Sequence, residues 1–365
     1  MASMIQDAGR YVIVELETDD GLVGLGEATV MPTWGGDHGV YYGETPGTTV
    51  SVIFELLYPA LRGLNPTEVE RAHVAMNRAV KGYPYAKAAL DIALHDLIGK
   101  AYNVPVYQLL GGRFHDRITL AHSIGMMSIE AAVAEARAVI DEGISTIKLK
   151  IGLDYTHDAE VVREVRAAIG HEVAICLDAN QAYPTPKTAV RELRRLEEYG
   201  LLLVEQPVQG LGEMAQVRRA IDTPVMADES AWTARDILQI ADLGAADAIS
   251  IYTTKPGGLF RARQALAVAE AAGLPCNVNG SGELGVGNAA NLHLSASAAI
   301  IELPCVYPVS APGESLPTQT AGRHYLDDVI SRPFEYQNGA LGVPSGPGLG
   351  IELDREKLER YEVRQ

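Results

Sequence analysis

Four apolar segments that end in charged residues decide the fold of this chain: TIKLKIG (146–152), AICLDAN (174–180), LLLVEQP (201–207) and PVMADES (224–230). The interval is 28 residues from Lys150 to Asp178, 27 from there to Glu205 and 23 on to Asp228, which is the length of one strand plus one helix. In a parallel barrel the carboxyl ends of all strands open at one mouth. The spacing therefore predicts a barrel in which these side chains meet.

The three acids Asp178, Glu205 and Asp228 predict a metal site at that mouth. Packed carboxylates repel one another, and burial raises their pKa unless a cation neutralises them. A hard cation with oxygen ligands solves this problem, and Mg²⁺ suits a few carboxylates together with water and a substrate oxygen. Acids also occur at strand ends because these ends are wet, but three on successive units, each after an almost wholly apolar run, favour the metal.

Lys148 and Lys150 alternate along one predicted strand, so both side chains point into the barrel. A lysine is costly there unless it faces charge. An ammonium beside a second ammonium and a metal has a lowered pKa, which makes it a usable general base near neutral pH. The alternative is a pair of structural salt bridges to the acids, which would leave the metal site without a chemical purpose.

The order and spacing of KLK, LDAN, VEQP and ADES resemble the muconate lactonizing subgroup of the enolase superfamily, from the early GLGEA to the closing GPGLGIEL. The resemblance implies an α/β fold, a modified TIM barrel of the (β/α)7β type with an α+β N-terminal capping domain. The implied domains are a capping domain at 1–113, a catalytic barrel at 114–309 and a segment at 310–365 that returns to the capping domain.

The same resemblance assigns roles to individual residues. It makes Asp178, Glu205 and Asp228 the Mg²⁺ ligands and Lys150 the base on one face of the substrate. It also places Lys148 behind that base, with Asn180 and Glu229 in support. The implied reaction removes a proton next to a substrate carboxylate, and the metal stabilises the resulting enediolate.

The strand DAISIYTTKPGGL (247–259) departs from the subgroup pattern, which has a second lysine base opposite the first. Aligning Gly257 and Gly258 puts Tyr252 at that position and Lys255 at a later basic position. A phenol has a pKa near ~10 and is a poor base at neutral pH. This favours a one-face reaction by a lyase (dehydratase) or cycloisomerase acting on a carboxylic or sugar acid. The alternatives are a racemase or epimerase that uses Tyr252 or Lys255, and a barrel that binds metal and ligand without catalysis; Tyr252 would then only shape the pocket.

Later motifs refine this prediction. Glu283, in GSGELGVG (280–287), matches an acidic position typical of the subgroup and is a further catalytic candidate. The preceding LPCNVNG lacks the histidine of the mandelate racemase type, and a GxGxxG in this loop is a weak dinucleotide fingerprint because no doubly wound pattern surrounds it. The segment IELPCVYP (301–308) lacks the paired aspartates of relatives that act on amino acids or dipeptides, which argues against an aminoacyl substrate.

The first third of the chain predicts a hairpin at 11–30 and helices at 50–61, 66–80 and 85–101. By resemblance, the loops at 31–47 and 81–87 reach toward the site, and another strand precedes the hairpin, so we expect the natural start to lie further upstream. The segment RITLAHSIG (117–125) is expected to open the barrel. His95 and His122 are expected to be structural.

Composition narrows the partners. The chain has 365 residues and a formal net charge of −17 without a basic patch, so nucleic acid and anionic membranes are poor partners. Three scattered cysteines indicate a reducing compartment, and neither a leader nor a long apolar span is visible. We therefore expect a cytoplasmic enzyme with a small-molecule carboxylate substrate, and a homo-oligomer like its relatives.

Overall fold

A computed structural model describes residues 11–30, 44–280, 282–307 and 327–363. Its largest part is a seven-stranded sheet in the order β10-β9-β8-β7-β6-β5-β4, with every neighbouring pair parallel. The strands are β4 (His122–Ile124), β5 (Thr146–Lys150), β6 (Ala174–Asp178), β7 (Leu201–Glu205), β8 (Val225–Ala227), β9 (Ala248–Ile251) and β10 (Cys276–Val278). The predicted α/β fold is confirmed.

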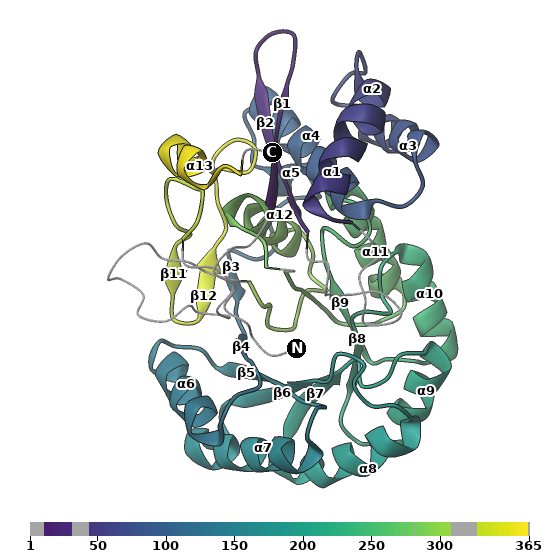
Figure 1. Cartoon of the computed structure of the whole chain (residues 1–365), viewed down its shortest axis with the longest axis vertical. Helices are drawn as coiled ribbons and strands as arrows, with labels where there is room; N and C mark the ends of the chain where they lie inside the picture. Colours follow the sequence, from purple (N-terminus) through teal and green to yellow (C-terminus); the bar gives the residue numbers. More distant parts are fainter. Residues whose placement is uncertain (1–10, 31–43, 281, 308–326, 364–365) are drawn as a thin grey trace.

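Helices alternate with these strands and form the outer wall of the curled sheet (Figure 1). They are α6 (Ile129–Asp141), α7 (Tyr155–Ile169), α8 (Pro186–Leu196), α9 (Leu211–Ala220), α10 (Ala234–Leu243), α11 (Leu259–Ala271) and α12 (Gly285–Ala296), with a 3-10 turn at Glu197–Tyr199. None of the helices in the described ranges is long and apolar enough to cross a membrane.

Isolated bridges close the sheet into a barrel. Ile301 pairs with Cys276 of β10, and Cys305 pairs with Leu120 just before β4. The main-chain N–H of Ala121 donates to Cys305 O at 2.8 Å, and Cys305 N–H donates to Thr119 O at 2.9 Å. The eighth strand is thus reduced to a few pairings between the two edges of the sheet.

The segment 117–125 is divided between two sheets, so the prediction that it forms one barrel strand is wrong in extent. Its first part is β3 (Arg117–Thr119), which pairs antiparallel with β12 (Ala340–Gly342); β12 in turn pairs with β11 (Tyr336–Gln337). Ile118 faces Leu341 in this register, and both side chains are buried. The chain end therefore supplies the partner of β3, which no local pattern reveals.

The barrel interior has an apolar floor below a polar layer. The floor is a cluster of inward-facing side chains from neighbouring strands: Cys176, Leu203, Met226 and Ala248. Because side chains of a strand alternate between its two faces, the next inward position lies two residues further on. Those positions are Asp178, Glu205, Asp228 and Ser250, all of them buried. The polar layer follows from this alternation.

The N-terminal region packs a hairpin and several helices around α4 (Pro84–Ala101), as seen at the top of Figure 1. Its elements are β1 (Tyr11–Glu17), β2 (Val23–Thr29), α1 (Pro46–Val52), a π-helical turn (Ile53–Leu57), α2 (Tyr58–Leu61), α3 (Val69–Ala79) and α5 (Val106–Leu109). Almost every residue of α4 is buried. Glycines allow β2 to approach α4 closely, since a Cβ on Gly26 would lie 1.8 Å from Ala89 O.

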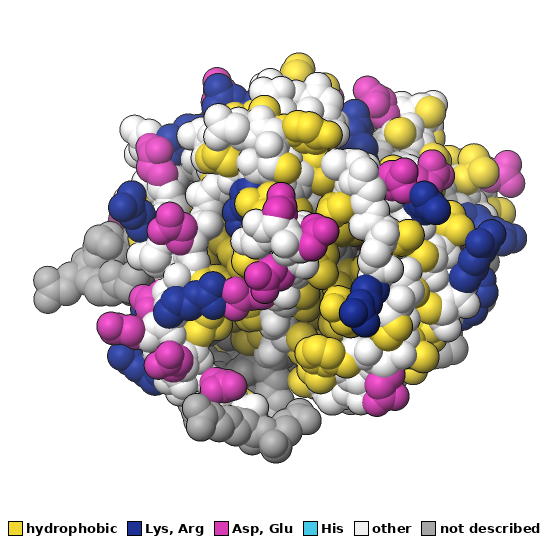
Figure 2. Space-filling model, turned by 90° about the horizontal axis from the view of Figure 1, so that it is seen from above, with side chains coloured by type: hydrophobic (Ala, Val, Ile, Leu, Met, Phe, Trp, Pro, Cys, Tyr) yellow, Lys and Arg dark blue, Asp and Glu magenta, His cyan; other side chains and the backbone are white. Residues whose placement is uncertain are grey.

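The C-terminal residues 327–363 return to the N-terminal region and end in α13 (Arg355–Tyr361). Asp96 of α4 links three parts of the chain, because it accepts hydrogen bonds from Leu25 N at 2.8 Å and Leu349 N at 2.7 Å and pairs with Lys100. On the face seen from above, acidic and basic side chains are interspersed with apolar and uncharged ones (Figure 2). That face carries no continuous basic patch.

Candidate active site

The ends of β5, β6 and β7 place charged side chains next to one another. Lys150 lies opposite Asp178 in the register of β5 and β6, and Asp178 lies opposite Glu205 in the register of β6 and β7. Lys150 Nζ donates to Asp178 Oδ2 at 2.6 Å and to Asn180 Oδ1 at 2.7 Å. Lys148 Nζ lies 2.7 Å from Glu205 Oε2 and 3.3 Å from Asp178 Oδ2. Both lysines face the acids, as their alternation predicts.

A second group of side chains lies around Asp228, at the end of β8. Lys255 forms an ion pair with the Asp228 carboxylate and donates to Asp228 O at 2.7 Å. The Lys255 ammonium also lies 4.0 Å from the centre of the Tyr252 ring, and the Tyr252 hydroxyl donates to Asp228 Oδ2 at 3.5 Å. Tyr252 and Lys255 therefore lie next to each other and both contact Asp228, and both side chains are buried.

Burial and neighbouring charges shift the pKa values of the residues in this cluster in different directions. Burial, and then the charge of Asp178, raise the pKa of Glu205 to about 8. Burial also acts to raise the pKa of Asp178, but the ammonium groups of Lys150 and Lys148 outweigh it and hold that pKa below its usual range. Burial acts to lower the pKa of Lys148, yet Glu205 and Asp178 outweigh it and raise that pKa above the ordinary value. The predicted lowering concerns an ammonium beside a bound Mg²⁺ and stays a prediction, whereas the acids alone raise the pKa of Lys148.

The donor set of the cluster fits a hard dication. The Oε1 atom of Glu205 and the Oε2 atom of Glu229 are buried without a hydrogen-bond partner among the described residues, and such orphan carboxylate oxygens are costly. No three His, Cys, Asp or Glu side chains in the described ranges converge closely enough to hold a metal as they stand. Lysine ammonium groups lie against these acids in the structure.

Gln206 and Asn180 are supporting residues with left-handed backbone angles, φ +38° and +42°. Gln206 Oε1 accepts hydrogen bonds from Asp228 N at 2.9 Å and Ser230 N at 3.2 Å, which fixes the turn after β8. Asn180 joins Lys150 to Glu229, because its Nδ2 donates to Glu229 Oε1 at 2.9 Å. Supporting roles for Asn180 and Glu229 follow from the resemblance, whereas that of Gln206 was not predicted, although this glutamine is part of the VEQP motif.

Glu283 is buried in the loop before α12. A Cβ on Gly280 would lie 2.4 Å from its Oε2 atom, and a Cβ on Gly287 would lie 2.5 Å from its Cγ atom. The same Gly287 N–H donates to Glu27 of β2 at 2.8 Å, as does Leu284 N–H at 2.7 Å. A carboxylate from the N-terminal region therefore caps the barrel helix α12, which the sequence analysis did not foresee.

The predicted histidines and loops have the following places. His122 turns outward to Glu135 on α6 at 2.8 Å, and His95 binds Asp91 within α4, so both are structural as predicted. Residues 31–43 of the predicted loop 31–47 lie outside the described part of the chain. At its end, Glu44 accepts hydrogen bonds from the first turn of α4, at 2.9 Å from Tyr85 N and 3.0 Å from Ala86 N.

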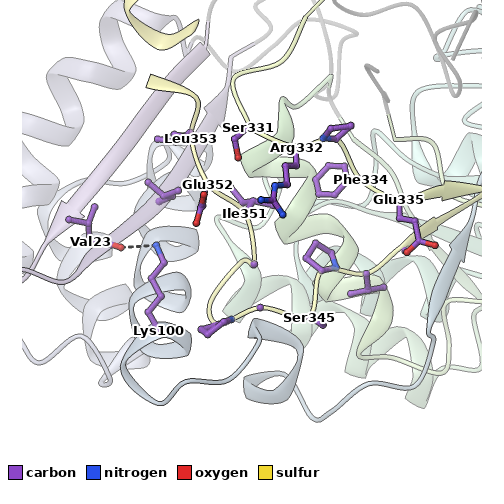
Figure 3. A pocket seen from close by; sticks show the side chains of 18 of the residues that line it. Val23, Lys100, Ser331, Arg332, Phe334, Glu335, Ser345, Ile351, Glu352 and Leu353 are labelled. Carbon is purple, nitrogen blue, oxygen red and sulfur yellow. Dashed lines mark hydrogen bonds between the residues drawn. The ribbon is translucent and has the colours of Figure 1, made fainter. Parts of the chain in front are cut away.

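Two hollows border the fold. A pocket of about 570 Å³ is lined by residues that follow the three acids, among them Gln181, Gln209 and Ser230. A larger groove of about 890 Å³ lies between β2, α4 and the C-terminal segment (Figure 3). Lys100 on its wall is engaged with Val23 O at 2.8 Å, and none of the predicted catalytic residues lines it. None of the predicted catalytic or metal-binding residues lines the smaller pocket either.

Comparison with known proteins agrees with this geometry. The family model described as Enolase C-terminal domain-like matches residues 131–357. The model described as Mandelate racemase / muconate lactonizing enzyme, N-terminal domain, matches residues 1–111. The barrel with its capping layer and acid cluster defines the class, an enolase-type barrel enzyme. The chain belongs to the mandelate racemase/muconate lactonizing enzyme family of the enolase superfamily.

Individual relatives differ in the reactions that their names give. The chain is 35% identical to the N-succinyl-L-Arg/Lys racemase of Bacillus cereus over 97% of this chain and 90% of the relative; a crystal structure of that racemase matches with a TM-score of 0.88 and covers 98% of this chain and 91% of the racemase chain. Muconate cycloisomerase 1 of Rhodococcus opacus is 32% identical over 99% of this chain and 93% of the relative. A dipeptide epimerase of Enterococcus faecalis, solved with Mg and L-Leu-L-Tyr, is 32% identical with a TM-score of 0.83, over 94% of this chain and 92% of that chain.

Proposed function

We propose that this enzyme removes a proton next to the carboxylate of a small substrate with Lys150 as the base. The observation that carries the proposal is the shared polar layer at the strand ends. In it the Lys150 amine lies 2.6 Å from Asp178 on the adjacent strand, and Glu205 lies opposite Asp178 on the strand after that. A base must lie on the substrate side of the charges that stabilise the product of proton transfer. Lys150, partly exposed on the last position of β5, meets this requirement better than the more buried Lys148.

Asp178, Glu205 and Asp228 would hold Mg²⁺. When bound, Mg²⁺ supplies positive charge to the substrate carboxylate as the proton leaves. The protein side of the reaction then falls to its own residues. Asn180 orients the Lys150 amine through the 2.7 Å hydrogen bond and is itself held by Glu229. Lys148 lies behind the acids and offsets their mutual repulsion.

On this geometry the favoured reaction is elimination or cycloisomerisation, with proton transfer on one face only. Tyr252 occupies the place of a second base, and a buried phenol holds its proton at neutral pH. Racemisation or epimerisation is the second candidate. It is favoured by the racemase among the relatives and by Lys255, whose ammonium lies beside the Tyr252 ring.

Deuterium incorporation in heavy water tests the proposal. We expect Mg²⁺-dependent exchange of the proton next to the carboxylate in a panel of muconate-like, N-acylamino and sugar acids. Lys150→Met is expected to abolish this exchange, whereas Lys187→Met, at an exposed lysine on α8, retains it. Exchange without inversion supports the lyase or cycloisomerase, and exchange with inversion supports the epimerase. Metal binding without any exchange would leave a barrel that only binds its ligand.

We further propose the domain limits 1–113, 114–309 and 310–365, and a homo-oligomer that works in the cytoplasm. The return of residues 348 and 349 to α4 and α5 supports the third limit, since Val106 N–H donates to Gly348 O at 2.9 Å. The cysteines Cys176, Cys276 and Cys305 are buried and unpaired with one another, as expected in a reducing compartment. Light scattering at several protein concentrations tests the oligomeric state.

A further inference from the structure

The helix α4 of the N-terminal region lies against the turn that carries Lys255. A Cβ on Gly257 would lie 3.6 Å from Pro84 O and 3.6 Å from Lys87 Cβ. A Cβ on Gly258 would lie 2.3 Å from Asp91 Oδ2, so only glycine allows this approach. Both glycines also have positive φ angles, +93° and +117°. The turn 253–258 is therefore seated directly on α4.

Asp91 is a carboxylate fully buried within this contact. Its Oδ1 atom lies 2.7 Å from His73 Nε2, and its Oδ2 atom lies 3.3 Å from His95 Nδ1. Phe260 N–H, in the first turn of α11, donates to Asp91 Oδ2 at 3.4 Å, and the Phe260 ring stacks on His73 with the centroids 5.3 Å apart. Gly258, the N-cap residue of α11, has no side chain with which to cap the helix. Asp91 supplies a negative charge at that positive helix end from a different part of the chain.

The turn itself has few degrees of freedom. Gly258 N–H donates to Thr253 O at 2.8 Å, and Gly257 N–H donates to Thr254 O at 3.1 Å. On the other side, Thr253 Oγ1 donates to Asn291 Oδ1 of α12 at 2.7 Å. A turn held between α4 and α12 moves as one piece, so its seat on α4 determines where the adjoining Tyr252 and Lys255 side chains meet Asp228.

We propose that Asp91, held by His73 and His95, is a positioning residue that sets the place of Tyr252 and Lys255 relative to the acid cluster. Asp91 lies below the turn, away from the reacting atoms, and acts through the first turn of α11. Its effect on turnover rests on the proposed function, whereas its effect on the turn does not. The two effects are therefore measured separately.

The matched pair of variants is Asp91→Asn and Asp96→Asn. Both acids lie buried on α4, but Asp96 binds Leu25, Leu349 and Lys100 and not the turn. Hydrogen exchange followed by mass spectrometry reports each region of the full chain. We expect Asp91→Asn to speed amide exchange at 253–262 by about tenfold and to leave 23–30 and 345–350 unchanged. We expect the reverse pattern for Asp96→Asn.

Equal exchange at 253–262 in Asp91→Asn and the unmodified protein would overturn the proposal, as would the same uniform increase in both variants. If Asp91→Asn does not fold, His95→Gln gives the same test, because it removes one partner of Asp91 and leaves both the carboxylate and the His73–Phe260 stack in place. The localised increase at 253–262 is expected there too, with a smaller amplitude.

The kinetic measurement uses α-proton exchange of the best acid from the panel. Asp91→Asn is expected to lower kcat by about tenfold with little change in KM, because misplaced groups weaken transition-state contacts more than ground-state binding. Asp96→Asn is expected to keep both constants after correction for the folded fraction. Equal loss in both variants would overturn the positioning role. Absence of turnover in the unmodified protein would refute the proposed function, and the amide exchange would still decide the role of Asp91.

Discussion

On the proposed function, the phenol of Tyr252 would limit proton exchange to one face of the substrate. Burial, and then the charges of Asp228 and Glu205, raise the pKa of Tyr252 well above that of a free tyrosine. A protonated phenol donates a hydrogen bond but does not remove a proton. On this proposal, the residue at position 252 bears on the type of reaction more directly than the fold does.

Tyr252→Lys is expected to create a second base opposite Lys150 and so to allow exchange of both stereoisomers of a chiral acid. Tyr252→Phe is expected to keep exchange on the Lys150 face within about tenfold, because a single hydrogen bond contributes roughly 1 kcal/mol. Chiral chromatography of the deuterated products measures both outcomes. Loss of all exchange in Tyr252→Phe would show that the hydroxyl itself transfers a proton.

Glu27 makes stability depend on pH. Burial raises the pKa of Glu27 to about 7, although Gly287 N–H, Leu284 N–H and Thr29 donate to it. Asp328, Glu283 and Tyr11 are ionisable groups close to Glu27. An acid whose pKa is higher in the folded state binds more protons there than in the unfolded chain. The free energy of unfolding therefore falls as the pH rises from the ordinary pKa of a glutamate through about 7, the pKa of Glu27 in the folded protein.

Urea unfolding between pH 5 and pH 8 measures this dependence. We expect the contribution of Glu27 to fall by about 3 kcal/mol across the window, since one pKa unit corresponds to about 1.4 kcal/mol. In Glu27→Gln this part of the pH dependence is expected to disappear. Glu17→Gln, at an exposed residue of the same hairpin, serves as the control and is expected to follow the unmodified protein. Identical pH profiles for all three proteins would contradict the prediction.

At the scale of elements, the close contact between β2 and α4 depends on two glycines. A Cβ on Gly24 would lie 2.2 Å from Ala93 O, and one on Gly26 would lie 1.8 Å from Ala89 O. The nearest atom in each case belongs to the backbone of α4, so no side-chain movement relieves either clash. The hairpin is thereby fixed on the helix that also carries Asp91 and Asp96.

Gly26→Ala is expected to destabilise the protein by about 3 kcal/mol or more, because overpacking forces β2 away from α4. The matched control is Gly212→Ala in α9, where a Cβ has nothing within 4 Å. That control is expected to stabilise by up to about 1 kcal/mol through helix propensity. Differential scanning calorimetry compares the two. A Gly26→Ala protein with unchanged Tm would show that β2 is free to shift.

Some elements could be predicted from the chain and others could not. The strand ends at 150, 178, 205 and 228 follow from local apolar runs, so their convergence was visible in the sequence. The division of 117–125 between two sheets was not visible, because its partner β12 is remote in the chain. The capping of α11 by Asp91 and of α12 by Glu27 likewise joins distant residues. A local signal was an acid and a histidine four residues apart on a helix that is buried along almost its whole length.

The pKa of Lys148 depends on distances that the sequence does not contain. The predicted lowering assumed a bound metal and a second lysine beside Lys148, whereas Glu205 and Asp178 are the nearest charges among the described side chains. Spacing along the chain predicts which groups meet. It does not give the separations in ångströms that decide the sign of a pKa shift.

At the scale of the whole molecule, the acid cluster predicts that a dication stabilises the fold. A ligand that binds only the folded state raises the free energy of unfolding, by about 2.7 kcal/mol at a hundredfold excess over Kd. We expect Mg²⁺ to raise Tm in the unmodified protein and in Asp242→Asn, an exposed acid of α10. Asp228→Asn is expected to abolish the shift, and removal of the metal with EDTA to reverse it. An equal shift in all three proteins would assign the metal to another place.

The pairing of β3 with the strands near the chain end also governs how the protein is made. Arg117 and its partner Glu335 are 218 residues apart. At ordinary rates of synthesis, roughly 10 to 40 seconds separate the appearance of the two on the ribosome. Throughout this interval the edge of β3 that pairs with β12 lies unpaired. Chaperones that shield such edges are expected to govern the yield of the protein during expression, and ribosome stalling late in the message is expected to send the chain into inclusion bodies.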